Sequence, residues 1–167
     1  MKLSDYQARA LETALPTALT PEYLAPMIVG EVGELFGALA KSMRDGWDEE
    51  RTKQTLTKEL GDVAWGVAVC MHELGITEEP PVDEEAEGIG DSAALGMLLS
   101  LASYLAKFHY HSDKAQMGES LIAMWIALRA FAYSITGLSF DEVLEANLAK
   151  LADRKQRGVI GGSGDER

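Results

Sequence analysis

Apolar residues recur at helical spacing through most of this 167-residue chain. One such series is Ile28, Val32, Leu35 and Leu39, and a second runs from 56 to 74. Positions three or four apart share one face of an α-helix, so each series predicts an amphipathic helix. The sequence contains no clean alternation of apolar and polar residues bounded by turn residues, which would predict a strand. We therefore expect an all-α helical bundle.

Helix boundaries follow from capping residues, prolines and glycines. Ser4 or Asp5 is expected to cap the first helix, and Ser139 or Asp141 the last. Pro21 and Pro26 are expected to bracket a short connection. The third helix is either continuous or broken before Gly75. The predicted helices span about 6–14, 26–44, 48–75, 92–110, 115–135 and 139–157.

The sequence also contains a weak internal repeat. Aligned without a gap, Glu59 matches Glu119 and Trp65 matches Trp125, whereas Asp62 matches Ile122. Both tryptophans are expected in the core. Duplication of a helical hairpin, with the second copy degenerate, would explain this repeat. Chance similarity between two amphipathic helices is the alternative. The expected organisation is one domain, 1–167, with a catalytic helical half (3–75), an acidic linker (76–91), a degenerate second hairpin (92–136), a C-terminal helix (138–157) and a Gly-rich tail (158–167).

Two carboxylate pairs have matching spacing, Glu31 with Glu34 and Glu59 with Asp62. Residues three apart project from one strip of a helix, and each pair lies at the edge of its apolar face. If the two helices pack as an antiparallel hairpin, the four carboxylates converge. Like charges at close range in a partly buried site need compensation. All-oxygen ligands of this kind suit Mg²⁺ or Mn²⁺.

Solvated surface glutamates and a ferritin-like di-iron site are the alternatives to a Mg²⁺ or Mn²⁺ site. Solvated glutamates are the ordinary state of a single such pair, but each pair here also encloses a glycine, Gly33 or Gly61. A glycine inside a helix is unfavourable by about 1 kcal/mol relative to alanine, so the two suggest close backbone approach or room beside the carboxylates. A ferritin-like di-iron site requires Glu-x-x-His pairs, and the sequence has none.

Composition limits which binding partners and which cellular compartment we expect for this protein. The chain has 27 acidic against 15 basic residues and a formal net charge of −12, so its overall field does not attract nucleic acid or anionic membranes. Cys70 is the single cysteine, which rules out an intrachain disulfide. No signal-peptide pattern begins the chain, and the longest apolar runs are too short to span a bilayer. We expect a cytoplasmic protein that binds phosphate groups only through local cations or bound metal.

The two carboxylate pairs resemble the ExxE…ExxD signature of the all-α nucleoside triphosphate pyrophosphohydrolases, a superfamily that includes the MazG-like proteins. The segment 147–158, NLAKLADRKQRG, resembles the end of short bacterial and phage MazG-like proteins, as does Lys41-Ser-Met-Arg44 after the first pair. The similarity covers roughly 3–74 and 138–167. The middle, 77–136, departs from the short family members.

The resemblance implies hydrolysis of a nucleoside triphosphate between its α- and β-phosphates. Glu31, Glu34, Glu59 and Asp62 would hold two or three Mg²⁺ or Mn²⁺ ions, and Glu34 would also take the proton of the attacking water. Cationic side chains and the amide of Asn147 would bind the substrate's phosphates and sugar. The candidates for this role are Lys41, Arg44, Asn147, Lys150, Arg154 and Arg157.

Several alternatives stay open. Analogy to phage nucleotide-pool enzymes points to a purine deoxynucleotide such as dGTP, whereas a dUTPase-like or phosphoribosyl-ATP pyrophosphohydrolase activity fits the same motif. A helical interaction module stabilised by metal, with decayed catalysis, is the alternative outside the enzymes. The resemblance also implies a homodimer or homotetramer, although the second hairpin of one chain could replace a partner subunit.

Overall fold

The computed structural model describes residues 1–81, 91–111 and 113–159, and these residues form helices without any strand. The prediction of an all-α bundle is confirmed. The predicted acidic linker and Gly-rich tail lie mostly in 82–90 and 160–167, outside the described residues. The elements are α1 (Leu3–Leu11), the 3-10 helix η1 (Pro16–Ala18), α2 (Pro21–Asp45), α3 (Glu49–Glu73), α4 (Asp91–His111), α5 (Lys114–Thr136) and α6 (Phe140–Gln156).

Two helices begin earlier than their sequence signals predict. The predicted caps of α1, Ser4 and Asp5, lie inside the helix, because the carboxylate of Glu79 accepts a hydrogen bond from the Leu3 N–H at 2.5 Å. Helix α2 begins at Pro21, after a Thr20 cap. Pro26 lies inside α2, at its sixth position, instead of bounding a connection, and the helix continues although Pro26 has no N–H to donate to the Glu22 carbonyl.

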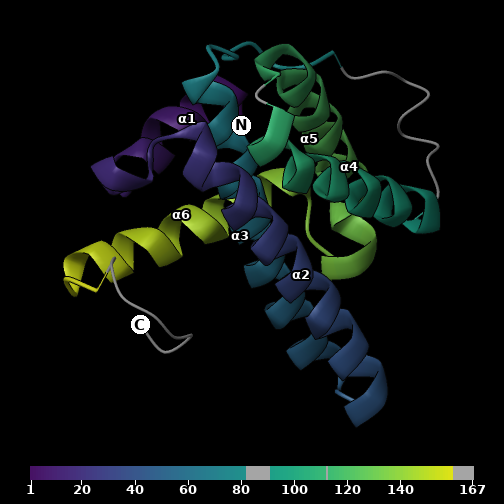
Figure 1. The fold of residues 1–167 in the computed structure, drawn as a ribbon. Coiled ribbons are helices and arrows are strands. Elements are labelled where there is room, and N and C mark those ends of the chain that lie inside the picture. The colour runs from purple at the N-terminus through teal and green to yellow at the C-terminus, as the bar shows by residue number, and fades with distance from the viewer. Residues whose placement is uncertain (82–90, 112, 160–167) are drawn as a thin grey trace.

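The helices pack as two hairpins with additional helices beside them (Figure 1). Helix α2 packs along α3 and α4 packs along α5, while α3 contacts α5 and α2 contacts α4. Helix α3 is continuous and contributes more buried residues than α2 does, including the stretch from Gly66 to Met71. Helices α1 and α6 both contact α3. Helix α3 is therefore the central element against which the others are positioned.

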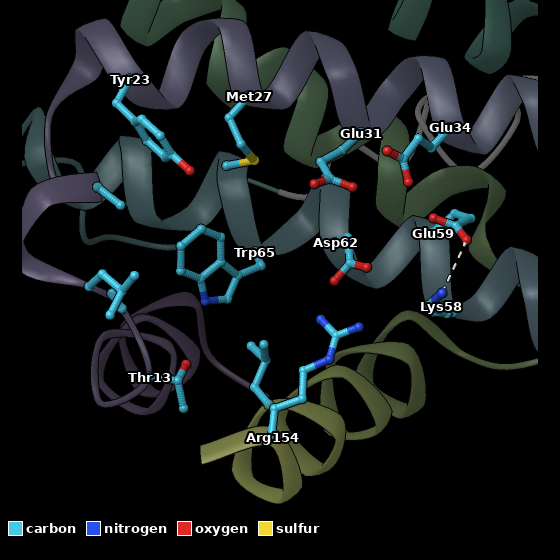
Figure 2. A pocket seen from close by; sticks show the side chains of 14 residues that line it. Thr13, Tyr23, Met27, Glu31, Glu34, Lys58, Glu59, Asp62, Trp65 and Arg154 are labelled. Carbon is cyan, nitrogen blue, oxygen red and sulfur yellow. Dashed lines mark ion pairs between the residues drawn. The ribbon is translucent and has the colours of Figure 1, made fainter. Parts of the chain in front are cut away.

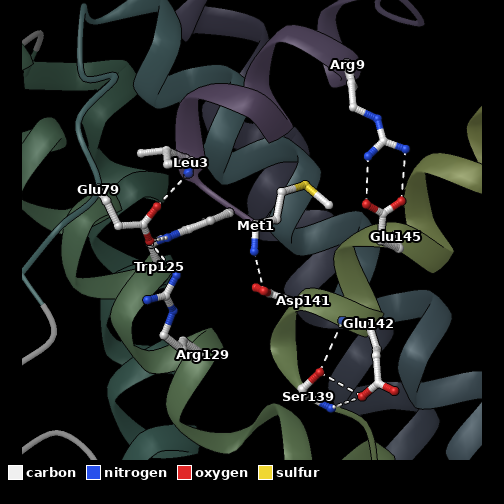
Figure 3. Close-up of polar contacts among 10 residues, drawn as sticks. All are labelled: Met1, Leu3, Arg9, Glu79, Trp125, Arg129, Ser139, Asp141, Glu142 and Glu145. Carbon is white, nitrogen blue, oxygen red and sulfur yellow. Dashed lines mark hydrogen bonds and ion pairs between the residues drawn. The ribbon is translucent and has the colours of Figure 1, made fainter.

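Polar contacts hold α1 against the rest of the bundle (Figure 3). Glu79, on the segment after α3, accepts from Trp125 Nε1 at 3.2 Å and forms an ion pair with Arg129. Arg9 of α1 forms two hydrogen bonds with Glu145 of α6, at 2.7 and 2.9 Å. Glu79 thus joins the start of α1 to α5, and Arg9 joins its end to α6.

Length and apolar composition alone would let α2 cross a membrane, and the bent pair α5–α6, with an angle of 88°, meets the same criteria when taken as one span. The sequence predicted no such segment, because its longest apolar runs are too short to span a bilayer. Core helices of soluble proteins often meet these criteria, and α2 packs against α3 and α4. The finding is weak evidence for a membrane span.

The start of α6 is the cap that the sequence predicts. Ser139 Oγ accepts from the Glu142 N–H, and the Glu142 side chain accepts from the Ser139 N–H, which completes a capping box (Figure 3). This cap sets where α6 begins and therefore the register of α6 against α3.

We expect Ser139→Ala to lower the free energy of unfolding by about 1 kcal/mol, because the Glu142 N–H at the start of α6 loses its partner and the Glu142 carboxylate loses the hydroxyl that donates to it. Urea denaturation would measure the loss. Ser134→Ala is the control, since Ser134 is exposed and bonds only to a carbonyl of its own helix. Equal stability of the two variants would show that the capping box does not hold α6.

Candidate functional site

A cleft of about 280 Å³ lies between α2, α3 and α6 (Figure 2). One end is lined by carboxylates from α2 and α3 together with Lys58 and Arg154. The other end is lined by mostly apolar side chains that include Met27 and Trp65. The cleft therefore joins a strongly polar region to a nonpolar one.

Three carboxylates form a cluster in the cleft. One oxygen each from Glu31, Glu34 and Glu59 lies within 4.8 Å of the other two. Glu59 is 8% exposed, Glu31 is intermediate and Glu34 is exposed, so the cluster runs from the helix interface toward solvent. The structure therefore brings together three of the four carboxylates that the sequence singles out.

Burial and like charge disfavour ionisation of this cluster. Desolvation first, and then the charges of Asp62, Glu34 and Glu59, raise the pKa of Glu31 to about 7. Desolvation also raises the pKa of Glu59, and the nearby Lys58, whose Nζ lies 3.8 Å from its carboxylate, acts in the opposite direction. A cluster of partly buried carboxylates with few cations nearby favours the binding of an added cation, because the cation offsets the repulsion between the carboxylates.

Asp62, the fourth carboxylate, lines the same cleft but bonds to α6. Asn147 Nδ2 donates to Asp62 Oδ1 at 3.1 Å, and Lys150 Nζ forms an ion pair with the same oxygen. Predicted candidates for phosphate binding, Asn147 and Lys150, thus contact a predicted metal ligand instead. Asn147 is buried at 4% exposure.

Gly61 explains how α6 comes so close to α3. A Cβ at Gly61 would lie 2.9 Å from Asn147 Cβ and 3.0 Å from its Nδ2. A Cβ at Gly33 would meet nothing within 4 Å in the described part of the chain. Close approach is therefore the role of Gly61, while Gly33 is exposed and makes no close contact of this kind.

The remaining predicted cations fall into two groups. Arg154 lines the cleft and its guanidinium points toward the carboxylates (Figure 2). Lys41 and Arg44 lie on the far part of α2, outside the described cleft lining, and Arg44 forms an ion pair with Asp45 at 2.7 Å. Arg157 lies just after α6 and pairs with Asp153 at 2.8 Å. Of the predicted cations, the structure places Arg154 and Lys150 nearest to the carboxylates.

Sequence reasoning missed several residues of the cleft. Lys58 directly precedes the second carboxylate pair, and that adjacency was the available signal. Trp65 was expected in the core, as Trp125 is at 1% exposure, but it is only partly buried and lines the cleft. Thr13 and Leu15 line it from the connection after α1, which begins earlier than predicted because α1 ends at Leu11 and not near residue 14.

The residues present fit divalent cations. The donors are carboxylate oxygens, which Mg²⁺ and Mn²⁺ prefer. The carboxylates are partly desolvated and repel one another, as the raised pKa of Glu31 indicates. A bound cation would offset this unfavourable charge. Glu31, Glu34 and Glu59 are close enough to share ions, and Asp62 lies beside them in the same cleft.

We expect Glu31→Gln to stabilise the metal-free protein. The folded-state pKa of Glu31, about 7, lies above its ordinary 4.5, so its ionisation opposes folding increasingly as pH rises between these values. The effect is nearly absent at about pH 4 and complete at about pH 8, where removal of the charge adds roughly 1–2 kcal/mol after allowance for solvent screening.

Thermal melts in chelator across this pH range would measure the gain, with the exposed Glu119→Gln on α5 as the matched control. A Glu31→Gln protein that is less stable than wild type at about pH 8 would contradict the expected charge repulsion.

The two motif glycines should respond oppositely to substitution. We expect Gly61→Ala to destabilise by about 1–3 kcal/mol, because its methyl group would overlap Asn147. Gly33→Ala should stabilise by up to about 1 kcal/mol through helix propensity, because its methyl group enters open space. Chemical denaturation of both variants checks the pair, and a stabilising Gly61→Ala would show that α6 does not need the close approach.

Residues 19–80 match the family model of the MazG nucleotide pyrophosphohydrolase domain. The match contains α2 and α3 and all four carboxylates, and it excludes α1, α4, α5 and α6. Comparison with curated proteins gave no match, and neither did comparison with solved structures. The α2–α3 hairpin is therefore similar to a MazG nucleotide pyrophosphohydrolase domain, and the chain continues on both sides of it.

Proposed function

We propose that this cleft hydrolyses a nucleoside or deoxynucleoside triphosphate between its α- and β-phosphates, releasing a nucleoside monophosphate and pyrophosphate. The observation that carries the proposal is the cleft itself, in which a cluster of carboxylates continues into a nonpolar region with Met27 and Trp65. Such a cleft suits a ligand that has metal-bound phosphates at one end and a planar base at the other. The MazG match of α2 and α3 supports the same reaction class.

We assign Glu31, Glu34, Glu59 and Asp62 as the ligands of two or three Mg²⁺ or Mn²⁺ ions. Bound divalent cations polarise phosphate oxygens and lower the pKa of a coordinated water. Glu34 is the exposed member of the cluster. Its carboxylate is therefore the one that an incoming water reaches first, and we assign it to accept that water's proton.

Phosphate binding must overcome a formal net charge of −12. Arg154 lines the cleft and Lys150 lies against Asp62, so we assign these two α6 cations to the substrate's phosphates. The planar guanidinium of Arg154 suits bidentate contact with phosphate oxygens. In this assignment Lys150 exchanges its bond to Asp62 for one to phosphate when metal and substrate bind.

The nonpolar end of the cleft is the proposed place of the base. Trp65 is only partly buried there, so its ring can offer a face to a planar ligand. Met27 lies across the cleft from it (Figure 2), and a flexible thioether adapts to bases of different shape. Purine deoxynucleotides such as dGTP are the first substrates to test, by analogy to phage nucleotide-pool enzymes.

We further infer that α4 and α5 are a degenerate second hairpin that supports the first. Helix α5 packs on α3 as α4 packs on α2. Glu119, the counterpart of Glu59, is exposed, and Trp125, the counterpart of Trp65, is buried.

We place the protein in the cytoplasm. We also propose a homodimer or homotetramer, since exposed apolar side chains such as Met43 and Tyr133 remain available for subunit contact.

A dUTPase-like or phosphoribosyl-ATP pyrophosphohydrolase activity would use the same carboxylates. An interaction module stabilised by metal would keep the fold without turnover. It predicts a thermal stability that rises with Mg²⁺ or Mn²⁺ in a protein that hydrolyses no nucleotide.

The deciding experiment measures pyrophosphate and monophosphate release from a panel of NTPs and dNTPs, dUTP and phosphoribosyl-ATP included, with Mg²⁺ or Mn²⁺. We expect turnover of one or a few nucleotides. Glu34→Gln should lower it by about 10²-fold or more, because it loses a metal ligand and a proton acceptor.

Glu119→Gln is the matched control and should keep wild-type turnover, since Glu119 lies on α5 and is not among the described residues that line the cleft. Undiminished turnover in Glu34→Gln would remove Glu34 from the mechanism. Metal-dependent stabilisation without hydrolysis of any nucleotide would favour the interaction module.

A further inference from the structure

A chain of two hydrogen bonds connects the buried face of α1 to the cleft. Tyr6 Oη donates to Asn147 Oδ1 at 3.0 Å, and Asn147 Nδ2 donates to Asp62 Oδ1 at 3.1 Å. Tyr6 is 0% exposed and Asn147 is 4% exposed. The chain therefore passes through three helices, α1, α6 and α3, and reaches the cleft only at Asp62.

The direction of both bonds follows from the chemistry of their ends. An ionised carboxylate only accepts hydrogen bonds, so the amide of Asn147 must present its NH₂ group to Asp62. The amide oxygen then faces Tyr6, where only a donor satisfies it. Burial, and secondarily the charge of Asp62, raises the pKa of Tyr6 well above its ordinary value, so the hydroxyl keeps its proton. Tyr6 thereby selects the amide orientation that serves Asp62.

Packing leaves this arrangement little freedom. The ring of Tyr6 lies against Trp125, with ring centroids 6.0 Å apart. On the opposite side, Asn147 lies against the backbone of Gly61, where a Cβ would have only 2.9 Å to its nearest neighbour. Neither side chain can move without disturbing a closely packed contact.

We propose that Tyr6 is a positioning residue for Asp62, holding its carboxylate through Asn147 in the orientation that receives a divalent cation. The inference rests on the proposed function only in taking Asp62 as a metal ligand. Asn147 and Lys150 both bind Oδ1, which leaves Oδ2 as the oxygen that the described residues make available to a cation. Tyr6 itself is fully buried and is not among the described residues that line the cleft.

Tyr6→Phe tests this role because it removes one hydroxyl and keeps the ring. The amide oxygen of Asn147 then lacks its donor, and the amide can rotate or shift at the expense of its bond to Asp62. Groups that orient metal ligands typically alter metal affinity about 10–100-fold when removed. We expect Tyr6→Phe to weaken Mn²⁺ binding about tenfold, measured by isothermal titration calorimetry on the full chain without nucleotide.

A double-mutant cycle separates positioning from general packing. If Tyr6 acts through Asn147, adding Tyr6→Phe to Asn147→Ala should cause no further loss of Mn²⁺ affinity. Gln7→Leu is the matched control. Gln7 is the buried neighbour of Tyr6 on α1 and donates to the carbonyls of Ala68 and Ile76, away from the chain of bonds. Gln7→Leu should lower the melting temperature and leave Mn²⁺ affinity unchanged.

Three results would overturn the inference: wild-type Mn²⁺ affinity in Tyr6→Phe, independent losses that multiply in the double variant, or an equal loss of Mn²⁺ affinity in Gln7→Leu. Wild-type protein that binds no Mn²⁺ would also overturn it. A cycle that behaves as expected in a protein that hydrolyses no nucleotide would refute the proposed function and leave the inference standing. Nucleotide hydrolysis together with wild-type Mn²⁺ affinity in Tyr6→Phe would support the proposed function and refute the role of Tyr6.

Discussion

The packing of α2 against α3 brings carboxylates together in a place where water only partly solvates them. Glu31 and Glu59 lie at the helix interface because the residues one turn further along the same faces, Leu35 and Val63, are core residues. Apolar burial stabilises the hairpin, and the crowded charges oppose it. The raised pKa of Glu31 is the direct sign of that opposition. Much of the remaining structure around the cleft supplies positive charge or hydrogen-bond donors to these carboxylates.

Helix α6 is the main source of those donors. It places Asn147 and Lys150 on Asp62 and directs Arg154 into the cleft, while Gly61 provides the room for its approach. The MazG match ends at residue 80, so α6 and α1 lie outside the matched segment. In this chain the elements that complete the cleft are therefore far away in sequence from the carboxylates that they serve.

The sequence predicted the helices well wherever a local signal determined them. The capping box at Ser139 and the periodic apolar face of α3 are examples, because a cap or a periodic stripe acts within a few residues. It failed at the start of α1, where the carboxylate that receives the Leu3 N–H belongs to Glu79. The prediction also failed at Pro26, because the sequence alone does not distinguish a proline that bounds a helix from one that lies inside it.

The sequence by itself determined the all-α architecture and the pairing of carboxylates on helix edges, since both depend on spacing along one helix. Only the tertiary structure decided which cations serve the carboxylates. Lys58 and Lys150 pair with carboxylates and Arg154 lines the same cleft, whereas Lys41 and Arg44 lie on the far part of α2. It also decided that Trp65 lines the cleft while Trp125 is buried. These outcomes depend on how helices distant in sequence cross, and the periodicity of a single helix holds no information about that crossing.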